Sequence, residues 1–164
     1  MKKAIIIDID GTISDSKERV NFLKKCLKNN DSDLCYEVFY QTAINDKPLV
    51  KNIVRIASYF VYHFNLDEIR REEFDVIFLT GRPERIREDT IKWVEEYFFR
   101  EKPKEGSVKY IFRKDKDFSQ DIFYKKRELD KLKKDYKIMA VFEDREHLVE
   151  MFKKELPKVD VIKM

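Results

Sequence analysis

Short runs of apolar residues alternate along this chain with longer stretches in which apolar residues recur every three or four positions. The short runs, rich in Ile and Val, are typical of buried β-strands, and the periodic stretches are typical of amphipathic helices. The predicted strands cover residues 4–8, 75–79, 108–112, 138–142 and 159–162. The predicted helices cover residues 16–28, 33–43, 48–64, 83–99, 120–134 and 145–155. Because helices separate the strands, the pattern predicts an α/β fold with a parallel sheet and right-handed crossovers.

Length and cysteine content limit the class of protein. The 164 residues suit one full hydrophobic core and are too few for two ordinary domains, so we expect a single domain over 1–164. The apolar runs are too short to cross a bilayer, and the N-terminal residues already form strand sequence, so we expect neither a membrane span nor a signal peptide. Cys26 and Cys35 form no CxxC pair. A structural zinc site or a disulfide framework is therefore improbable, and we expect a reducing, cytoplasmic location.

Charge is spread unevenly along the chain. The formal net charge is +3, but residues 100–137 hold 14 basic and 8 acidic side chains, a balance of +6. Such a basic segment suits an anionic, even polymeric, substrate. The alternative is a solvated helix face of mixed charge, which is common in Lys-rich sequences.

Two carboxylates follow the first predicted strand, in the sequence Asp8-Ile9-Asp10-Gly11-Thr12. Residues two apart on a strand share a face, so Asp8 and Asp10 would repel each other unless a cation lay between them. Hard carboxylate oxygens favour Mg²⁺ as that cation. The alternative is a solvated Asp-Gly turn at the end of a strand. Two other strands also end in polar residues, Thr80-Gly81-Arg82 and Glu143-Asp144.

These strand ends, together with Lys125 in a basic helix, resemble the four motifs of the haloacid dehalogenase (HAD) superfamily, most of whose members are Mg²⁺-dependent phosphatases. The resemblance implies a Rossmann-like fold with strand order 5-4-1-2-3 and helices on both faces of the sheet. It also implies a small helical cap inserted at residues 13–74, between the first two motifs. The long helix of this insert must serve as the crossover to the second strand, so we expect an open site.

The resemblance also implies a role for each catalytic residue. Asp8 is the expected nucleophile, which forms an aspartyl-phosphate, and Asp10 is the expected general acid and base. Thr80 and the amide of Gly81 are expected to donate to the phosphoryl oxygens, and Lys125 to supply a fixed positive charge. An aspartate at position 10 points to a phosphatase or a phosphomutase, because the dehalogenases of the superfamily lack this acid, and the mutases usually carry a larger cap.

The expected Mg²⁺ ligands are four acidic positions. The carboxylate of Asp8, the backbone carbonyl of Asp10 and the carboxylate of Asp144 are expected ligands. Glu143 binds the metal directly or through water, and the sequence leaves open which of Glu143 and Asp144 is the direct ligand.

Within the superfamily, the chain most resembles the 3′-phosphatase domain of phage-type polynucleotide kinase-phosphatases. The residues that carry this resemblance lie in three stretches, at 80–94, 113–125 and 144–152. The chain departs from the family pattern at Ser119, where an arginine is usual, and at Glu143, where an aspartate is usual. It also lacks the GxxxxGK[ST] loop of the kinase half. The implied substrate is a phosphorylated DNA or RNA 3′ end.

Some residues and the substrate itself have more than one interpretation. Arg113 is the expected substrate contact, and Arg82 either contacts phosphate or pairs with a nearby carboxylate. Lys126 replaces Lys125 if the helix begins one residue later. The chain could instead be a HAD phosphatase of nucleotides or other small phosphate esters. A non-catalytic module that binds phosphate or nucleic-acid ends is a further alternative, which the complete set of motifs disfavours.

Overall fold

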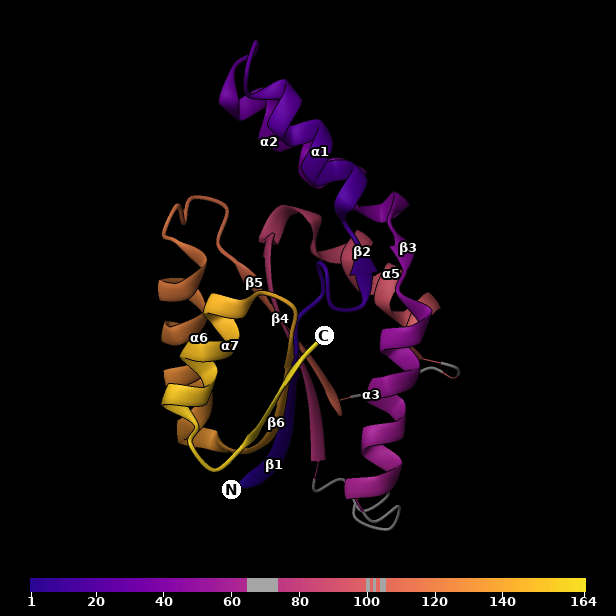
Figure 1. The fold of residues 1–164 in the computed structure, drawn as a ribbon, viewed down its shortest axis with the longest axis vertical. Coiled ribbons are helices and arrows are strands. Elements are labelled where there is room, and N and C mark those ends of the chain that lie inside the picture. The colour runs from indigo at the N-terminus through magenta and orange to yellow at the C-terminus, as the bar shows by residue number, and fades with distance from the viewer. Residues whose placement is uncertain (65–73, 100, 102, 104–105) are drawn as a thin grey trace.

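The computed structural model describes residues 1–64, 74–99, 101, 103 and 106–164. Part of the predicted cap insert, residues 65–73, and part of the loop after residue 99 therefore lie outside the described residues. A five-stranded parallel sheet forms the centre of the molecule (Figure 1). Its strands are β1 (Lys2–Ile7), β4 (Phe74–Pro83), β5 (Val108–Arg113), β6 (Tyr136–Glu143) and β7 (Asp160–Lys163).

The order of these strands is β5-β4-β1-β6-β7, which places β1 at the centre of the sheet. When only the strands of this sheet are counted, and the sheet is read from its β7 edge, this is the predicted order 5-4-1-2-3. The labels differ because the structure contains two further strands that the sequence did not predict. These are β2 (Ser14–Asp15) and β3 (Lys47–Pro48), which form a separate antiparallel pair.

Helices cover both faces of the sheet, as predicted (Figure 1). On one face lie α6 (Asp121–Asp135) and α7 (Glu146–Glu155), and on the other lie α3 (Val50–His63) and α5 (Arg87–Tyr97), which follows the short helix η2 (Glu84–Ile86). Successive residues of β1 point to opposite faces. Ile6 therefore packs in the core beneath α6 and α7, whereas Ile5 and Ile7 pack in the core beneath α3 and α5. This burial on both faces explains the unbroken apolar run of the first strand.

A helical hairpin rises from the carboxyl end of the sheet (Figure 1). It consists of α1 (Lys17–Cys26) and α2 (Ser32–Gln41), and a short helix η1 (Thr42–Asn45) leads back to the body. The β2–β3 pair closes the base of this hairpin. Ile56 of α3 is fully buried in the core, so α3 covers the sheet as the predicted crossover. Among the described residues of the insert, α1, α2 and the short η1 are left to form the cap.

The structure joins Cys26 and Cys35 in a disulfide, so the expectation that the chain holds no disulfide is wrong. The turn after α1 reverses the chain, and the side chain of Asp31 caps α2 by accepting from the backbone N–H groups of Asp33 and Leu34. This reversal brings the two cysteine Cα atoms to 5.7 Å, a normal disulfide separation. Sequence spacing alone does not show this proximity, because it arises from the packing of two helices.

No helix in the described part of the chain is both long enough and apolar enough to cross a bilayer.

Candidate active site

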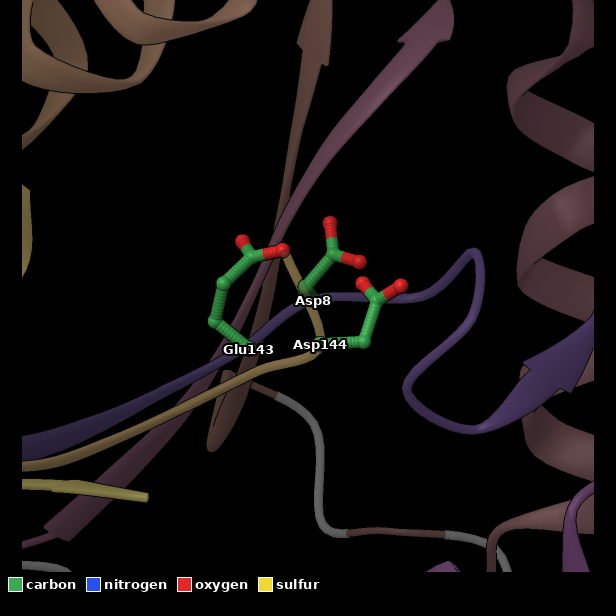
Figure 2. Close-up of side chains that lie close together, drawn as sticks. All are labelled: Asp8, Glu143 and Asp144. Carbon is green, nitrogen blue, oxygen red and sulfur yellow. The ribbon is translucent and has the colours of Figure 1, made fainter. Parts of the chain in front are cut away.

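Three carboxylates meet where the central strands end (Figure 2). Asp8 directly follows β1, Glu143 is the last residue of β6, and Asp144 follows it. Asp8 and Glu143 are buried, and one ligand oxygen from each of the three residues lies within 4.8 Å of the others. Parallel strands deliver their carboxyl ends to the same edge of the sheet, which is why residues distant in sequence converge here.

Lys125 of α6 lies within this acidic group. Its ammonium group donates to Asp8 Oδ1 and to Glu143 Oε2, at 2.5 Å in each case, and its side chain is buried. Burial opposes the charged form of Lys125, but the carboxylates of Asp8 and Glu143 outweigh it and raise its pKa. Burial and the nearby Glu143 also raise the pKa of Asp8. The neighbouring Lys126 instead pairs with Glu155 on the outer side of the helix, so Lys125 is the lysine at the site.

Glu143 and Asp144 have different surroundings. Both oxygens of Glu143 already have partners, because Oε2 accepts from Lys125 and Oε1 accepts from the backbone N–H of Arg145 at 3.2 Å. Asp144 instead faces the loop after β1, where Thr12 Oγ1 lies 3.4 Å from its Oδ1. Gly11 has a φ of +85°, and a Cβ at this position would collide with the Asp144 carboxylate. Glycine is thus required both by the turn and by the closeness of this acid.

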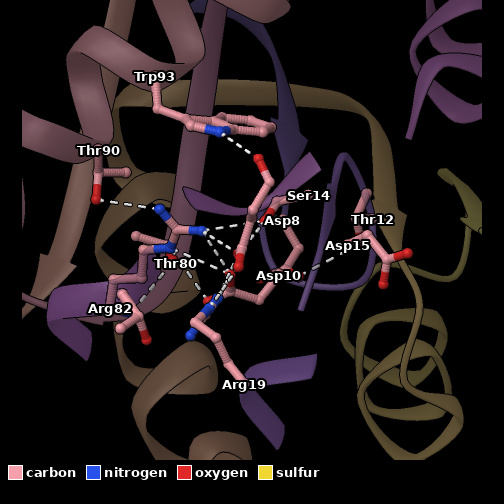
Figure 3. Close-up of polar contacts among 12 residues, drawn as sticks. Asp8, Asp10, Thr12, Ser14, Asp15, Arg19, Thr80, Arg82, Thr90 and Trp93 are labelled. Carbon is pink, nitrogen blue, oxygen red and sulfur yellow. Dashed lines mark hydrogen bonds and ion pairs between the residues drawn. The ribbon is translucent and has the colours of Figure 1, made fainter. Parts of the chain in front are cut away.

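Two arginines hold the carboxylate of Asp10 (Figure 3). Arg19 Nη2 and Arg82 Nη2 each lie 2.7 Å from Asp10 Oδ1. Burial alone would raise the pKa of Asp10, but the guanidinium groups of Arg82 and Arg19 outweigh it and hold the pKa at about 2. Asp10 is therefore ionised in this structure at ordinary pH.

The same arginines also bind Asp46, at the end of the cap. Arg19 donates from Nε to Asp46 Oδ1 and from Nη2 to Oδ2, both at 2.6 Å, and Ser14 Oγ donates to Oδ2 at 2.6 Å. Trp93 of α5 fixes the backbone of this position by donating from Nε1 to the Asp46 carbonyl at 2.9 Å. This network joins the base of the hairpin to the body of the molecule beside Asp10.

Sequence analysis missed Arg19 and Asp46. The one available signal was that Arg19 lies in the first turn of α1. Cations are unfavourable there because of the helix dipole, so an arginine at this position needs a partner elsewhere. For Asp46, which lies between two predicted helices, the pattern offered no signal.

Of the two interpretations of Arg82, the structure shows the one in which Arg82 pairs with nearby carboxylates. Its side chain is buried, and its guanidinium group also contacts Ser14 and Thr90 in addition to Asp10 and Asp46. The other interpretation, a contact between Arg82 and the phosphate, stays a prediction. Thr80 is buried, and its hydroxyl accepts from the backbone N–H of Arg82 at 3.1 Å.

Arg113 is the last residue of β5 and lies beside Gly81 of β4. It pairs with Asp121 and donates to the Ser119 carbonyl at 2.5 Å, and its guanidinium carbon lies 4.7 Å from the centre of the Tyr124 ring. Within the described residues, its buried Nε has no hydrogen-bond partner. A Cβ on Gly81 would lie 3.9 Å from Arg113 Nη2. Arg113 thus borders the site, and its contact with substrate stays a prediction.

Comparisons with known structures support the fold. Two structures of a Pnkp1/Rnl/Hen1 complex, one of them named as an RNA repair complex, match with TM-scores of 0.64 and 0.67 at 22% identity. The chain is covered completely in both but spans only 42% and 46% of the matched chains. A class C acid phosphatase from Bacillus anthracis with tungstate bound matches with a TM-score of 0.58 at 13% identity, covering 100% of this chain and 67% of the acid phosphatase. No curated protein matches the chain.

The family comparison covers more than half of the chain. The model of the polynucleotide kinase PNKP phosphatase domain, a HAD family, matches residues 60–162, which include β4, the lysine of α6 and the acids at the end of β6. The prediction of a HAD-family phosphoric monoester hydrolase is confirmed, and the chain belongs to the family of PNKP phosphatase domains.

Proposed function

We propose that this chain hydrolyses phosphate monoesters through a phosphoaspartate on Asp8, and that its substrates are 3′-phosphate ends of polynucleotides. The observation that carries the proposal is the position of Asp8, whose carboxylate lies between the Lys125 ammonium group and the carboxylate of Asp144. This position provides a nucleophile, a fixed cation and an acidic ligand at one point.

The residues present fit a Mg²⁺ ion. Asp8 and Asp144 would hold it, together with the backbone carbonyl of Asp10, because hard oxygen ligands suit this ion. Glu143 is occupied by Lys125 and by a backbone N–H group, so we assign it to positioning Lys125. When bound, the ion would offset negative charge on the phosphoryl oxygens.

The proposed reaction has two steps. In the first, an oxygen of Asp8 attacks phosphorus and the bond from phosphorus to the substrate oxygen breaks, while Asp10, which is ionised in the free site, passes the proton of the monoanionic ester to the departing oxygen. In the second, Asp10 takes a proton from water as the water attacks phosphorus, which releases phosphate and restores Asp8. The ion pairs of Asp10 with Arg19 and Arg82 favour its ionised form, which suits the second step.

A second candidate substrate class is small phosphate esters, and the charges on α6 favour it. Lys126, Arg127, Lys131 and Lys133 all pair with nearby carboxylates. The basic segment therefore has the mixed charge of a solvated helix face rather than a track for a polyanion. The assignment of polynucleotide ends rests on family membership and on Arg113 beside Gly81.

The test is phosphate release from four substrates in Mg²⁺ and in chelator. We expect release from p-nitrophenyl phosphate only with Mg²⁺, and a higher kcat/KM for a 3′-phosphorylated oligonucleotide than for a 3′-mononucleotide or a 5′-mononucleotide. Equal kcat/KM values for the oligonucleotide and the two mononucleotides would favour the alternative that the substrates are small phosphate esters. Absence of turnover on every substrate would remove the proposed reaction.

A further inference from the structure

A groove lies beside the active site, between the cap and the body. Its volume is about 580 Å³, within the range of small-molecule sites. One wall is α2 of the cap, and the other is the loop between β5 and α6, both at the carboxyl end of the sheet (Figure 1). The proposed reaction does not use this groove.

The groove borders the phosphate site at Gly81. Arg113 and Asp121 line the groove, and a Cβ on Gly81 would lie 3.4 Å from Asp121 Oδ1 and 3.9 Å from Arg113 Nη2. On the opposite wall lie Tyr36 and Tyr40 of α2. The groove therefore reaches the residue whose amide is an expected donor to the phosphoryl oxygens.

Aromatic side chains stand along the groove. Phe118, in the β5–α6 loop, is 89% exposed, and Tyr36 of α2 is 42% exposed. The rings of Tyr36 and Tyr40 are stacked with their centres 6.4 Å apart, and the guanidinium carbon of Arg85 lies 5.3 Å from the centre of the Tyr40 ring. Exposed aromatic rings beside a groove are suited to stacking on the flat face of a base.

The charges of the groove argue against a second phosphate as the occupant. Both arginines of its lining already have carboxylate partners, since Arg85 pairs with Glu37 at 3.0 Å and with Asp115 at 3.5 Å, and Arg113 pairs with Asp121. The lining holds five acidic residues and three basic ones, so the groove disfavours a polyanion and favours a flat, uncharged group.

We propose that this groove binds the base of the terminal nucleotide, by stacking on Phe118 and Tyr36, while the 3′-phosphate of that nucleotide lies at Asp8. The proposal rests on the proposed function and adds a base-binding site to it.

The test compares two oligonucleotides that differ only in their 3′-phosphorylated terminal residue, which either carries a base or is abasic. The wild-type protein should prefer the base-bearing end by about tenfold or more in kcat/KM, the scale of one base–aromatic stack. Phe118→Ala should remove most of this preference without changing turnover of the abasic end, and Phe118→Trp should keep it. The control is Phe123→Ala, a 63% exposed phenylalanine on α6 outside the described lining of the groove.

The outcomes separate this inference from the proposed function. Equal turnover of the two ends by the wild-type protein would overturn the base site and leave the phosphatase intact. An equal loss from Phe118→Ala and Phe123→Ala would also overturn it. If neither oligonucleotide is turned over while p-nitrophenyl phosphate is hydrolysed normally, polynucleotide ends are removed as substrates instead.

Discussion

Arg19, in the first turn of α1, donates to Asp10 across 2.7 Å, so the cap itself holds the proposed acid–base residue. Its guanidinium group also binds Asp46, at the other end of the cap. A planar fork can make these bonds together, whereas an ammonium group cannot. The cap of this protein is therefore part of the machinery that positions Asp10.

From this relationship we predict that Arg19→Ala lowers kcat for p-nitrophenyl phosphate by about 100-fold, because misplacement of a reacting group by about 1 Å costs this much. Arg19→Lys should recover only a small part of the loss. The exposed Lys17→Ala, in the same helical turn, is the matched control and should retain kcat. The measurement is steady-state kinetics, with circular dichroism as a check that each variant folds. A wild-type kcat in Arg19→Ala would contradict the role of Arg19 in positioning Asp10.

The nucleophile is tested by Asp8→Asn. This change removes the attacking charge and keeps the shape, so kcat should fall by about 10⁴-fold or more, on the scale of losing a covalent catalyst. The folded protein should become more stable in chelator, because the carboxylates of Glu143 and Asp144 no longer face a third negative group. Near-native turnover in Mg²⁺ would show that Asp8 is not the nucleophile.

A metal titration distinguishes the roles of Glu143 and Asp144, the two acids at the end of β6. Asp144→Asn should weaken Mg²⁺ binding, measured by calorimetry, more than Glu143→Gln does, because Glu143 is engaged by Lys125. Glu143→Gln should instead lower kcat at saturating Mg²⁺, since Lys125 would keep only Asp8 as a charged partner. The reverse ranking of Mg²⁺ affinities would exchange the two roles and leave the reaction class unchanged.

The sequence predicted the sheet and the acidic site for a clear physical reason. Strand ends in a parallel sheet occupy one edge, so acids such as Asp8 and Asp144 could be brought together from topology alone. The contacts of Arg19 could not be predicted in this way. They depend on the angle at which a helical hairpin leaves the body, which short-range periodicity does not encode.

The same limit explains the error about Cys26, and why the two interpretations of Arg82 could not be separated from the sequence. Cysteine spacing was interpreted along the chain, whereas the disulfide depends on how α1 packs on α2. Arg82 was interpreted from its neighbours at the strand end, but its partner Asp46 lies 36 residues away in sequence. The contacts of both residues depend on how the cap packs, and the cap is the part of the chain where the sequence pattern was least informative.

The disulfide can be tested by alkylation. In protein purified without reductant, Cys26 and Cys35 should resist alkylation in denaturant, and each should be labelled once reductant is added. A disulfide that closes a loop with a sequence separation of 9 contributes about 2–3 kcal/mol in the chain-entropy model, so reduction should expose the hairpin to proteolysis. The control is Cys26→Ser, whose digestion should not change with reductant. Full labelling without reductant would contradict the bond.

The last prediction concerns Asp121, which accepts hydrogen bonds from Arg113 and Arg145. Burial alone would raise the pKa of Asp121, but the guanidinium groups of Arg145 and Arg113 outweigh it and hold the pKa below its usual value. A carboxyl whose pKa is lowered by folding stabilises the native state above the unfolded pKa of about 3.9, and this contribution is lost as the pH falls through the folded pKa.

Asp121→Asn should therefore lower Tm at pH 7, and its difference from wild type should shrink steadily below about pH 4, where the carboxyl becomes protonated in both states. The matched control is Asp89→Asn on the exposed side of α5, which should change Tm little at any pH. Thermal unfolding followed by circular dichroism at pH 7, 5 and 3 gives the comparison. A Tm difference that stays constant down to pH 3 would mean that Asp121 contributes through packing, not through its charge, and that Arg113 is held beside Gly81 by other contacts.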